Sequence, residues 1–211
     1  MVQRREAQHG ATARKVRHPV TRSKRSLPIY PTASEIPLLL SACEPERARR
    51  LLKLIWWTGG RISEVLQVRA GDLTKHGLRL TNLKQRQTRE KHVFLPAACM
   101  SQLREWTAGM GPSQIIVGRL SDGERLTRER AWQIVTTVSK RAGIYKKHPN
   151  GDVRPLSPHK FRHGNAVHQI EAGLPINVVS AQLGHADLSS TTVYLTLADP
   201  HRQELVSRVT F

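Results

Sequence analysis

Apolar residues recur at the spacing of amphipathic helices along most of the chain after Pro28. Thr32 and Glu35 are spaced as a capping box, and they predict a helix that continues through Leu40. A second helix is predicted over residues 46–57, where the apolar positions are Leu51, Leu52, Leu54, Ile55 and Trp56.

Two adjacent glycines, Gly59 and Gly60, end the second predicted helix. A short third helix follows, because Ile62, Val65 and Leu66 lie at i, i+3 and i+4 on one face. Capping residues, prolines and glycines then mark the bounds of the remaining helices. These are predicted from Pro96 to about Ala108, Thr127 to Arg141, Ser157 to Gly173, Pro175 to Leu183, and from about Pro200 onward.

Strand-like alternation occurs in two short runs, residues 78–80 and 92–95, joined by a polar stretch over residues 81–91. They predict an antiparallel hairpin with a basic tip. No internal repeat is present. The expected fold is therefore mainly α (α+β), a helical domain with one small antiparallel hairpin or sheet.

The charge balance favours a polyanionic partner. Among 211 residues, 34 Lys and Arg oppose 16 Asp and Glu, a net charge of +18. Nucleic acid is the first expectation and an anionic membrane surface the second, although no apolar run approaches the roughly 20 residues of a spanning helix. A basic protein without specificity stays an alternative. Cys43 and Cys99 lack metal-ligand spacing and fit a reducing cytoplasm.

Residues 1–27 form a separate basic segment, with one acid, Glu6. We expect a disordered arm that could order on DNA, or else a solubilising tail, ahead of a folded domain over residues 28–211. Its eight basic residues are Arg4, Arg5, Arg14, Lys15, Arg17, Arg22, Lys24 and Arg25.

Two pairs of residues at i, i+3 suggest a phosphate site. Arg61 and Glu64 share a helix face, so Glu64 could orient the guanidinium, although a surface ion pair is the simpler reading. His159 and Arg162 also share a face. A guanidinium can hold two phosphate oxygens, and an imidazole can carry a proton.

Zinc is the rival reading, because His159 and His163 have i, i+4 spacing. Lys160 stands where a zinc protease has its glutamate, and no third ligand is convincingly placed. We therefore expect neither a metal nor another cofactor.

Tyr194 is the candidate nucleophile, and His159 or His185 could be its base. Lys84, in the hairpin, could give a proton to a leaving hydroxyl as a general acid. Arg86, Arg89 and Lys91 compete for that role, or all four merely contact DNA phosphates.

Taken in order, these segments resemble the tyrosine recombinases, or phage integrase family, over about residues 30–205. The motifs are Thr-Gly-Gly-Arg61-Ile-Ser-Glu64-Val-Leu, Lys84 in a hairpin, His159-Lys-Phe-Arg162-His163, Leu-Gly-His185 and Tyr194.

The resemblance implies that Tyr194 attacks DNA, forms a 3′-phosphotyrosyl link and frees a 5′-hydroxyl, without ATP or metal. Arg61 and Arg162 would clamp the phosphate, Lys84 would be the hairpin lysine, His159 and His185 the histidines, and Glu64 a supporting acid. Arg22, Lys24, Arg25, Arg86, Arg89, Lys91 and Lys160 are the expected DNA contacts.

By the same resemblance, the partner is double-stranded DNA. We expect a tetramer on two DNA sites, a monomer possible without DNA, residues 200–211 as a helix donated to a neighbour, and a location on DNA in a prokaryotic cytoplasm.

Three features depart from the family pattern. Gly164-Asn165 replace a small or hydroxyl residue followed by an apolar one, so the packing near Arg162 is expected to differ. Lys84 lacks the frequent preceding glycine. Because residues 1–27 are too few for the separate core-binding domain of typical members, we expect the chain to lack it, like the single-domain recombinases that invert fimbrial promoter segments.

Two alternatives use the same residues differently. A topoisomerase would reseal its own strand, and a catalytically idle DNA-binding regulator would keep the fold without needing Tyr194.

Overall fold

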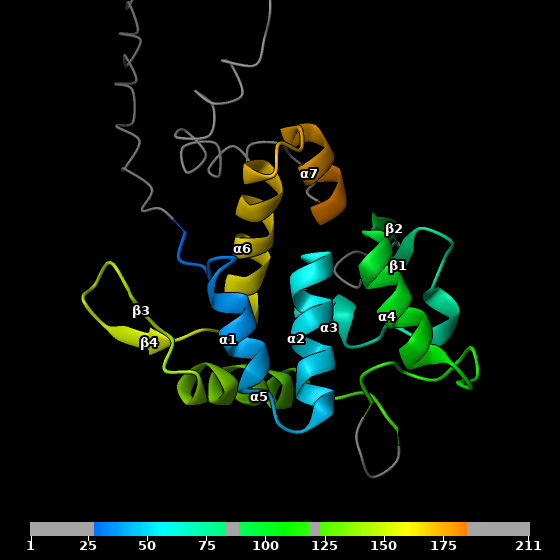
Figure 1. Ribbon diagram of the computed structural model, residues 1–211, viewed down its shortest axis with the longest axis horizontal. Helices are drawn as coiled ribbons and strands as arrows, with labels where there is room; N and C mark the ends of the chain where they lie inside the picture. The colour runs from blue at the N-terminus through cyan, green and yellow to red at the C-terminus, as the bar shows by residue number, and fades with distance from the viewer. Residues whose placement is uncertain (1–27, 83–88, 119–122, 185–211) are drawn as a thin grey trace, which may run out of the picture.

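The structure, a computed structural model, describes residues 28–82, 89–118 and 123–184. These ranges contain seven α-helices, a short 3₁₀ helix (η1, Ala70–Asp72) and two antiparallel two-stranded sheets (Figure 1). The predicted mainly α fold with a small sheet is confirmed. The basic arm, Tyr194 and the helix expected from about Pro200 lie outside the described residues.

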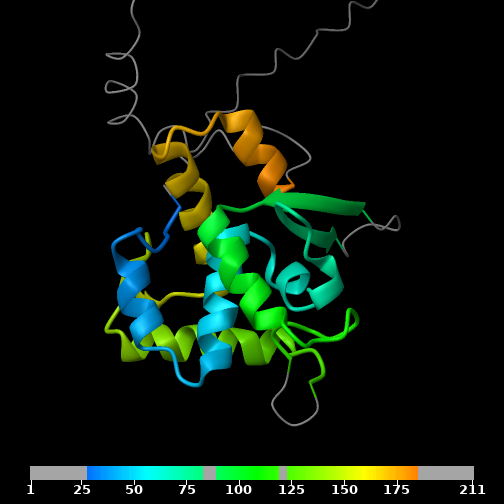
Figure 2. The ribbon, with the colours of Figure 1, turned by 45° about the vertical axis from the view of Figure 1, so that its right-hand side comes forward.

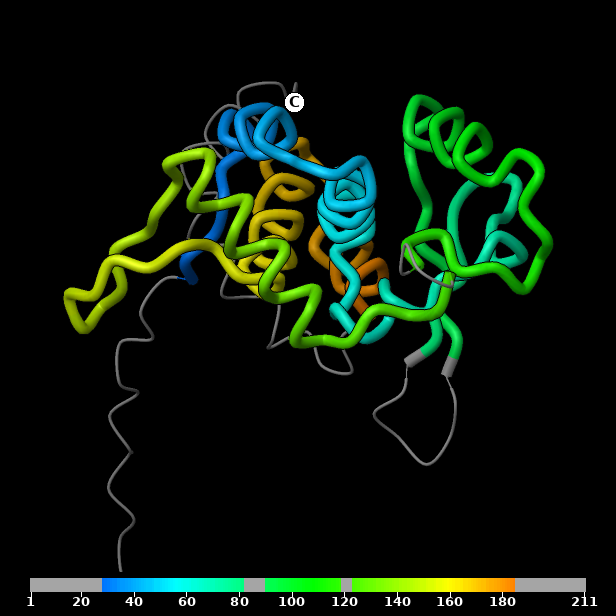
Figure 3. The backbone as a smooth tube through the Cα atoms, turned by 90° about the horizontal axis from the view of Figure 1, so that it is seen from below, coloured from blue at the N-terminus to red at the C-terminus, as the bar shows by residue number. Residues whose placement is uncertain are grey.

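Helix α2 (Glu46–Thr58) runs through the centre of the fold. Its residues Leu51, Leu52, Leu54 and Ile55 are almost fully buried and belong to the main hydrophobic core. Figure 3 shows β1, β2 and α4 on one side of α2, and α1, α5 and α6 on the other. Burial on more than one face explains why the apolar residues of α2 are nearly consecutive.

The other helices end close to their predicted bounds. They are α1 (Glu35–Ser41), α3 (Ile62–Val65), α4 (Ala97–Thr107), α5 (Arg128–Arg141), α6 (Pro158–Glu171) and α7 (Ile176–Leu183). Glu35 accepts the backbone N–H of Thr32 at 2.8 Å, which is one half of the predicted capping box. Thr127 caps α5 as predicted, since its hydroxyl accepts the backbone N–H of Arg130 at 3.1 Å.

The predicted hairpin forms from β1 (Gly77–Asn82) and β2 (Arg89–Phe94), which are longer than the alternation indicated. Leu80 pairs with Lys91 and Leu78 with Val93. Directly paired residues share a face of the sheet, and Leu78, Leu80 and Val93 are buried. Lys91 therefore belongs to the inward face of β2, and not to the hairpin tip where the sequence analysis placed it.

A second hairpin, β3 (Tyr145–Lys147) and β4 (Val153–Pro155), was not predicted. Its strands are too short to show alternation, but Asn150-Gly151 between them is a common hairpin turn. The Lys146 ammonium lies 2.6 Å from a Glu35 carboxylate oxygen and ties the hairpin to α1. None of the helices in the described ranges is long and apolar enough to cross a membrane.

Gly164 and Asn165 of α6 lie where this helix packs on α2. A Cβ at position 164 would lie 2.7 Å from the Pro31 carbonyl oxygen and 2.9 Å from the Trp56 ring, so the close approach requires glycine. The Asn165 side-chain amide donates to the Trp56 carbonyl at 2.6 Å. Near Arg162, Gly164 and Asn165 thus give a close contact and a polar link between the two helices.

Gly164→Ala is expected to lower the free energy of unfolding by about 1–2 kcal/mol, because overpacking outweighs the higher helix propensity of alanine. Urea denaturation followed by circular dichroism measures this change. The control is Gly111→Ala, where the nearest atom to a new Cβ is 3.7 Å away and a change of less than about 0.5 kcal/mol is expected. Equal stability of the two variants would contradict the packing argument.

Candidate active site

Arg162 is the most deeply buried charged group of the predicted site, with 4% of its surface exposed. Its Nη1 donates to the Gly59 carbonyl at 2.7 Å and its Nη2 to the Leu183 carbonyl at 2.9 Å. Gly59 caps the end of α2 and Leu183 is the last residue of α7. Carbonyls at helix C-termini lack intrahelical partners and carry partial negative charge, so they suit a buried guanidinium.

Arg61 lies at the N-cap of α3, and Glu64 orients it from the first turn. Arg61 Nη1 lies 2.8 Å from Glu64 Oε1, and the Arg61 backbone N–H donates to Glu64 Oε2 at 3.0 Å. Glu64 is 1% exposed and Arg61 is partly exposed. The pair is therefore not the surface ion pair that the sequence left open.

Lys91 brings a third cation to the same place. Its Nζ lies 3.0 Å from Glu64 Oε2 and donates to the Leu183 carbonyl at 2.8 Å. Figure 2 shows the C-terminal end of α7 beside β2, where this contact is made. We call Arg61, Glu64, Lys91 and Arg162 the cationic cluster; it joins residues from β2, α6 and the beginning and first turn of α3.

The electrostatics of the cationic cluster are coupled. Burial would raise the pKa of the Glu64 carboxyl, but Lys91 and Arg61 outweigh burial and hold it below its usual value. Burial lowers the pKa of Lys91 to about 8; Glu64 opposes this shift, while Arg162 and Arg61 add to it. Three cations against one buried carboxylate leave a surplus of positive charge, which favours an anion.

His159 is exposed at the beginning of α6, one turn before Arg162. It lines a pocket of about 440 Å³ together with Ile62, the first residue of α3, so the beginnings of the two helices are neighbours. The rings of His159 and His163 meet edge to face with centroids 4.4 Å apart. Within the described ranges, no group of three or more His, Cys, Asp or Glu side chains could hold a metal ion.

The remaining predicted residues divide into two groups. Lys160 is half-buried on α6, where burial lowers its pKa, and Arg89 begins β2. Lys84, Arg86, His185, Tyr194, Arg22, Lys24 and Arg25 lie outside the described residues. The sequence analysis missed the buried contacts of Lys91; the available signal was its place two residues before Val93, on the inward side of the strand.

Solved structures of site-specific recombinases share this fold. The structure of XerA recombinase matches with a TM-score of 0.68 and 20% identity, over 88% of this chain and 67% of that one. XerH recombinase bound to its difH substrate matches with a TM-score of 0.63 and 23% identity, over 80% of this chain and 50% of that one. The fold is the catalytic fold of the tyrosine recombinases.

Comparison of the sequence identifies the family of the chain. Residues 30–201 match the model of the phage integrase family, and the chain belongs to that family. It is 31% identical to tyrosine recombinase XerD of Mycobacterium tuberculosis over 207 residues, and 25% identical to XerA of Pyrococcus furiosus over 201 residues. These matches cover 90% and 93% of this chain but only 62% and 66% of the two relatives.

A shorter relative is matched along more of its length. A resolvase of Escherichia coli is 30% identical over 206 residues, which are 83% of this chain and 78% of that protein. The expectation of a tyrosine recombinase family member is confirmed. The roles of individual residues stay predictions.

Glu64→Gln is expected to lower the free energy of unfolding at pH 7 by about 3 kcal/mol, because Lys91 would stay buried without a carboxylate partner. The pKa of Glu64 is lower in the folded chain, so its contribution is complete above about pH 4.5, its ordinary value. The stability difference between the parent chain and the variant should shrink as the pH falls below this value.

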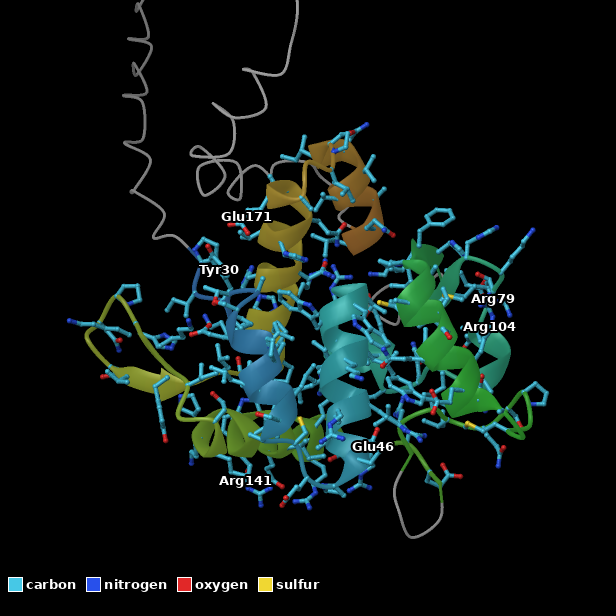
Figure 4. The ribbon with its side chains drawn as sticks, in the orientation of Figure 1. Tyr30, Glu46, Arg79, Arg104, Arg141 and Glu171 are labelled. Atoms are coloured by element: carbon cyan, nitrogen blue, oxygen red, sulfur yellow. The ribbon has the colours of Figure 1, made fainter. Side chains whose placement is uncertain are left out.

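Urea denaturation from pH 7 down to pH 3 measures this dependence. Glu46→Gln is the control, since Glu46 is half-exposed beside Arg49 at the other end of α2 (Figure 4) and its pair is worth less than about 1 kcal/mol. A difference for Glu64→Gln that is equally small, or independent of pH, would contradict this account of the cationic cluster.

Proposed function

We propose that this chain is a site-specific DNA recombinase that cuts and rejoins strands through a 3′-phosphotyrosyl intermediate formed by Tyr194. The observation that carries the proposal is the cationic cluster. In it Arg61 pairs with the buried Glu64 carboxylate, and Lys91 links that carboxylate to the Leu183 carbonyl that Arg162 also binds. Membership of the phage integrase family supports it, as do the relatives named as recombinases and a resolvase.

Arg61 and Arg162 bind the scissile phosphate in this proposal. Negative charge grows on the non-bridging oxygens when phosphorus becomes five-coordinate, and guanidinium groups fixed in advance stabilise that charge without reorganising. Burial of Arg162 between two carbonyls supplies the fixed position. Glu64 orients Arg61 from the first turn of α3.

The chemical step exchanges one phosphoester for another. The phenolic oxygen of Tyr194 bonds to phosphorus, and the bond from phosphorus to the 5′ oxygen breaks. His159 or His185 takes the phenolic proton, and Lys84 gives a proton to the leaving 5′ oxygen, which becomes a hydroxyl. Attack by a 5′-hydroxyl of a second strand reverses the step, so neither ATP nor a metal ion is required.

Double-stranded DNA is the proposed partner, and a tetramer on two DNA sites the proposed assembly. The proposed DNA contacts are Lys160, Arg86 and Arg89, with Arg22, Lys24 and Arg25 in the basic arm. Among the matched structures, a lambda integrase is a tetramer bound to a Holliday junction. The proposed location is on DNA in a prokaryotic cytoplasm.

Tyr194→Phe is expected to abolish covalent attachment to DNA. A nicked DNA substrate, from which the short 5′-hydroxyl fragment diffuses away after cleavage, traps the phosphotyrosyl protein for detection by denaturing electrophoresis. The substrate carries DNA from the region around the gene that encodes the chain. Absence of any adduct with the parent chain would contradict the proposal and favour the idle DNA-binding regulator. Relaxation of supercoiled DNA without exchange between sites would favour a topoisomerase.

Arg162→Lys is expected to slow single-turnover cleavage by about 10²–10³-fold, because one ammonium group cannot replace a fork of donors that joins two carbonyls and a phosphate. The control is Arg104→Lys on α4, where an exposed guanidinium donates to the Lys75 carbonyl at 3.1 Å (Figure 4). Cleavage by this control should match the parent chain. Equal rates in both variants would remove Arg162 from the phosphate site.

A further inference from the structure

Lys91 links the Arg61–Glu64 pair of the cationic cluster to the Leu183 carbonyl that Arg162 binds. Its ammonium group binds the Glu64 carboxylate, which orients Arg61, and the Leu183 carbonyl, which also accepts Arg162. The lysine is 27 residues from Glu64 and 92 from Leu183 along the chain. The side chain is 14% exposed, so these contacts are sheltered from water.

The first contact divides the carboxylate of Glu64 between two partners. Oε1 accepts Nη1 of Arg61, while Oε2 accepts the Arg61 backbone N–H and the Lys91 ammonium. Without Lys91, Oε2 would lose a cationic partner and could draw a second donor of the Arg61 guanidinium into a two-pronged pair. Those donors would then face the carboxylate and be lost to a phosphate.

The second contact fixes the end of α7. Lys91 and Arg162 meet at the Leu183 carbonyl, and the Gln182 amide bonds both the N–H and the carbonyl of Phe94 in β2, at 2.9 and 3.1 Å. A Cβ on Gly184 would lie 2.8 Å from Lys91 Cδ, so a glycine there leaves room for the lysine stem. His185 is the next residue along the chain.

We propose that Lys91 is a positioning residue for strand cleavage. It holds Arg61 and Arg162 in position relative to each other, and it anchors the end of α7 immediately before His185. This inference rests on the proposed function. It assigns Lys91 a role other than contact with DNA phosphates, and one distinct from the general acid role proposed for Lys84.

The positioning depends on the charge of the amine. The charged groups facing Lys91 are Glu64, Arg61 and Arg162, and burial among them lowers its pKa to about 8. Above that pH the neutral amine no longer pairs with Glu64. The part of the cleavage rate that depends on Lys91 should therefore be complete below pH 8 and lost as the pH rises through it.

The test compares Lys91→Met, which keeps a long unbranched side chain and removes its charge, with Lys146→Met. Lys146 is a matched control, because it is also a shielded lysine paired with a glutamate, 2.6 Å from Glu35, and lies on the β3–β4 hairpin. Single-turnover cleavage of the nicked substrate at saturating protein, from pH 6.5 to 9.5, separates cleavage from DNA affinity.

At pH 7 we expect Lys91→Met to cleave about 10–100-fold more slowly than the parent chain, since a misplacement of about 1 Å at a reacting centre can cost about 10²-fold. Lys146→Met should cleave at the parent rate. The ratio of parent to Lys91→Met rates should fall towards one as the pH rises through 8. An equal rate at pH 7, or a ratio that does not change with pH, would overturn the inference.

A second readout does not need cleavage. The Nε–H resonances of Arg61 and Arg162, assigned by their substitution with lysine, should shift in Lys91→Met and stay unchanged in Lys146→Met. Unshifted resonances in Lys91→Met would overturn the inference even if the parent chain forms no adduct. A missing adduct together with shifted resonances would instead contradict the proposed function alone.

Discussion

The burial of the Arg162 guanidinium is the constraint on which the arrangement of the site depends. A cation with 4% of its surface exposed must be compensated by the protein, and the structure does this with the carbonyls of Gly59 and Leu183. Each carbonyl lies at the end of a different helix, so one side chain of α6 links the C-terminal ends of α2 and α7. Left-handed glycines follow the last turns of both helices, with φ of 56° at Gly59 and 66° at Gly184.

The use of helix-end carbonyls also explains how the cationic cluster holds three cations with one buried carboxylate, Glu64. Carbonyls at helix ends offer partial charges that cannot be protonated, whereas a second carboxylate would reduce the surplus positive charge. Glu64 instead holds Arg61 and Lys91, and the cationic cluster keeps more positive than negative charge. A site of this kind gains from binding an anion such as a phosphodiester, and the fold bears the cost of holding the cations together beforehand.

Sequence reasoning recovered features that depend on local spacing. The helices around Leu51 and Ile170, the cap at Thr127 and the Arg61–Glu64 pair all follow from residues within about four positions of each other, where helix geometry determines which side chains meet. Lys91 was assigned to the hairpin tip because the apolar alternation was taken to begin at His92. A lysine is ordinarily assigned to a solvent-exposed position unless its buried partners are known. Its partner Leu183 is 92 positions away, and no local pattern can supply that contact.

The same distinction explains Gly164-Asn165, where the chain departs from its family. As residues of α6 they look poorly chosen, because glycine weakens a helix and a buried amide requires partners. Where α6 packs on α2, both residues hold the two helices close together. Gly164 lets Trp56 and Pro31 approach, and Asn165 satisfies the Trp56 carbonyl three residues before the one that Arg162 binds. Gln169 holds the Asn165 amide from one turn further along α6, with its Nε2 2.6 Å from Asn165 Oδ1. Two side chains of α6 thus satisfy carbonyls three positions apart at the end of α2. Gly164 and Asn165 thus help to anchor Arg162, because the helix end that accepts the guanidinium is held in place by the same helix that carries it.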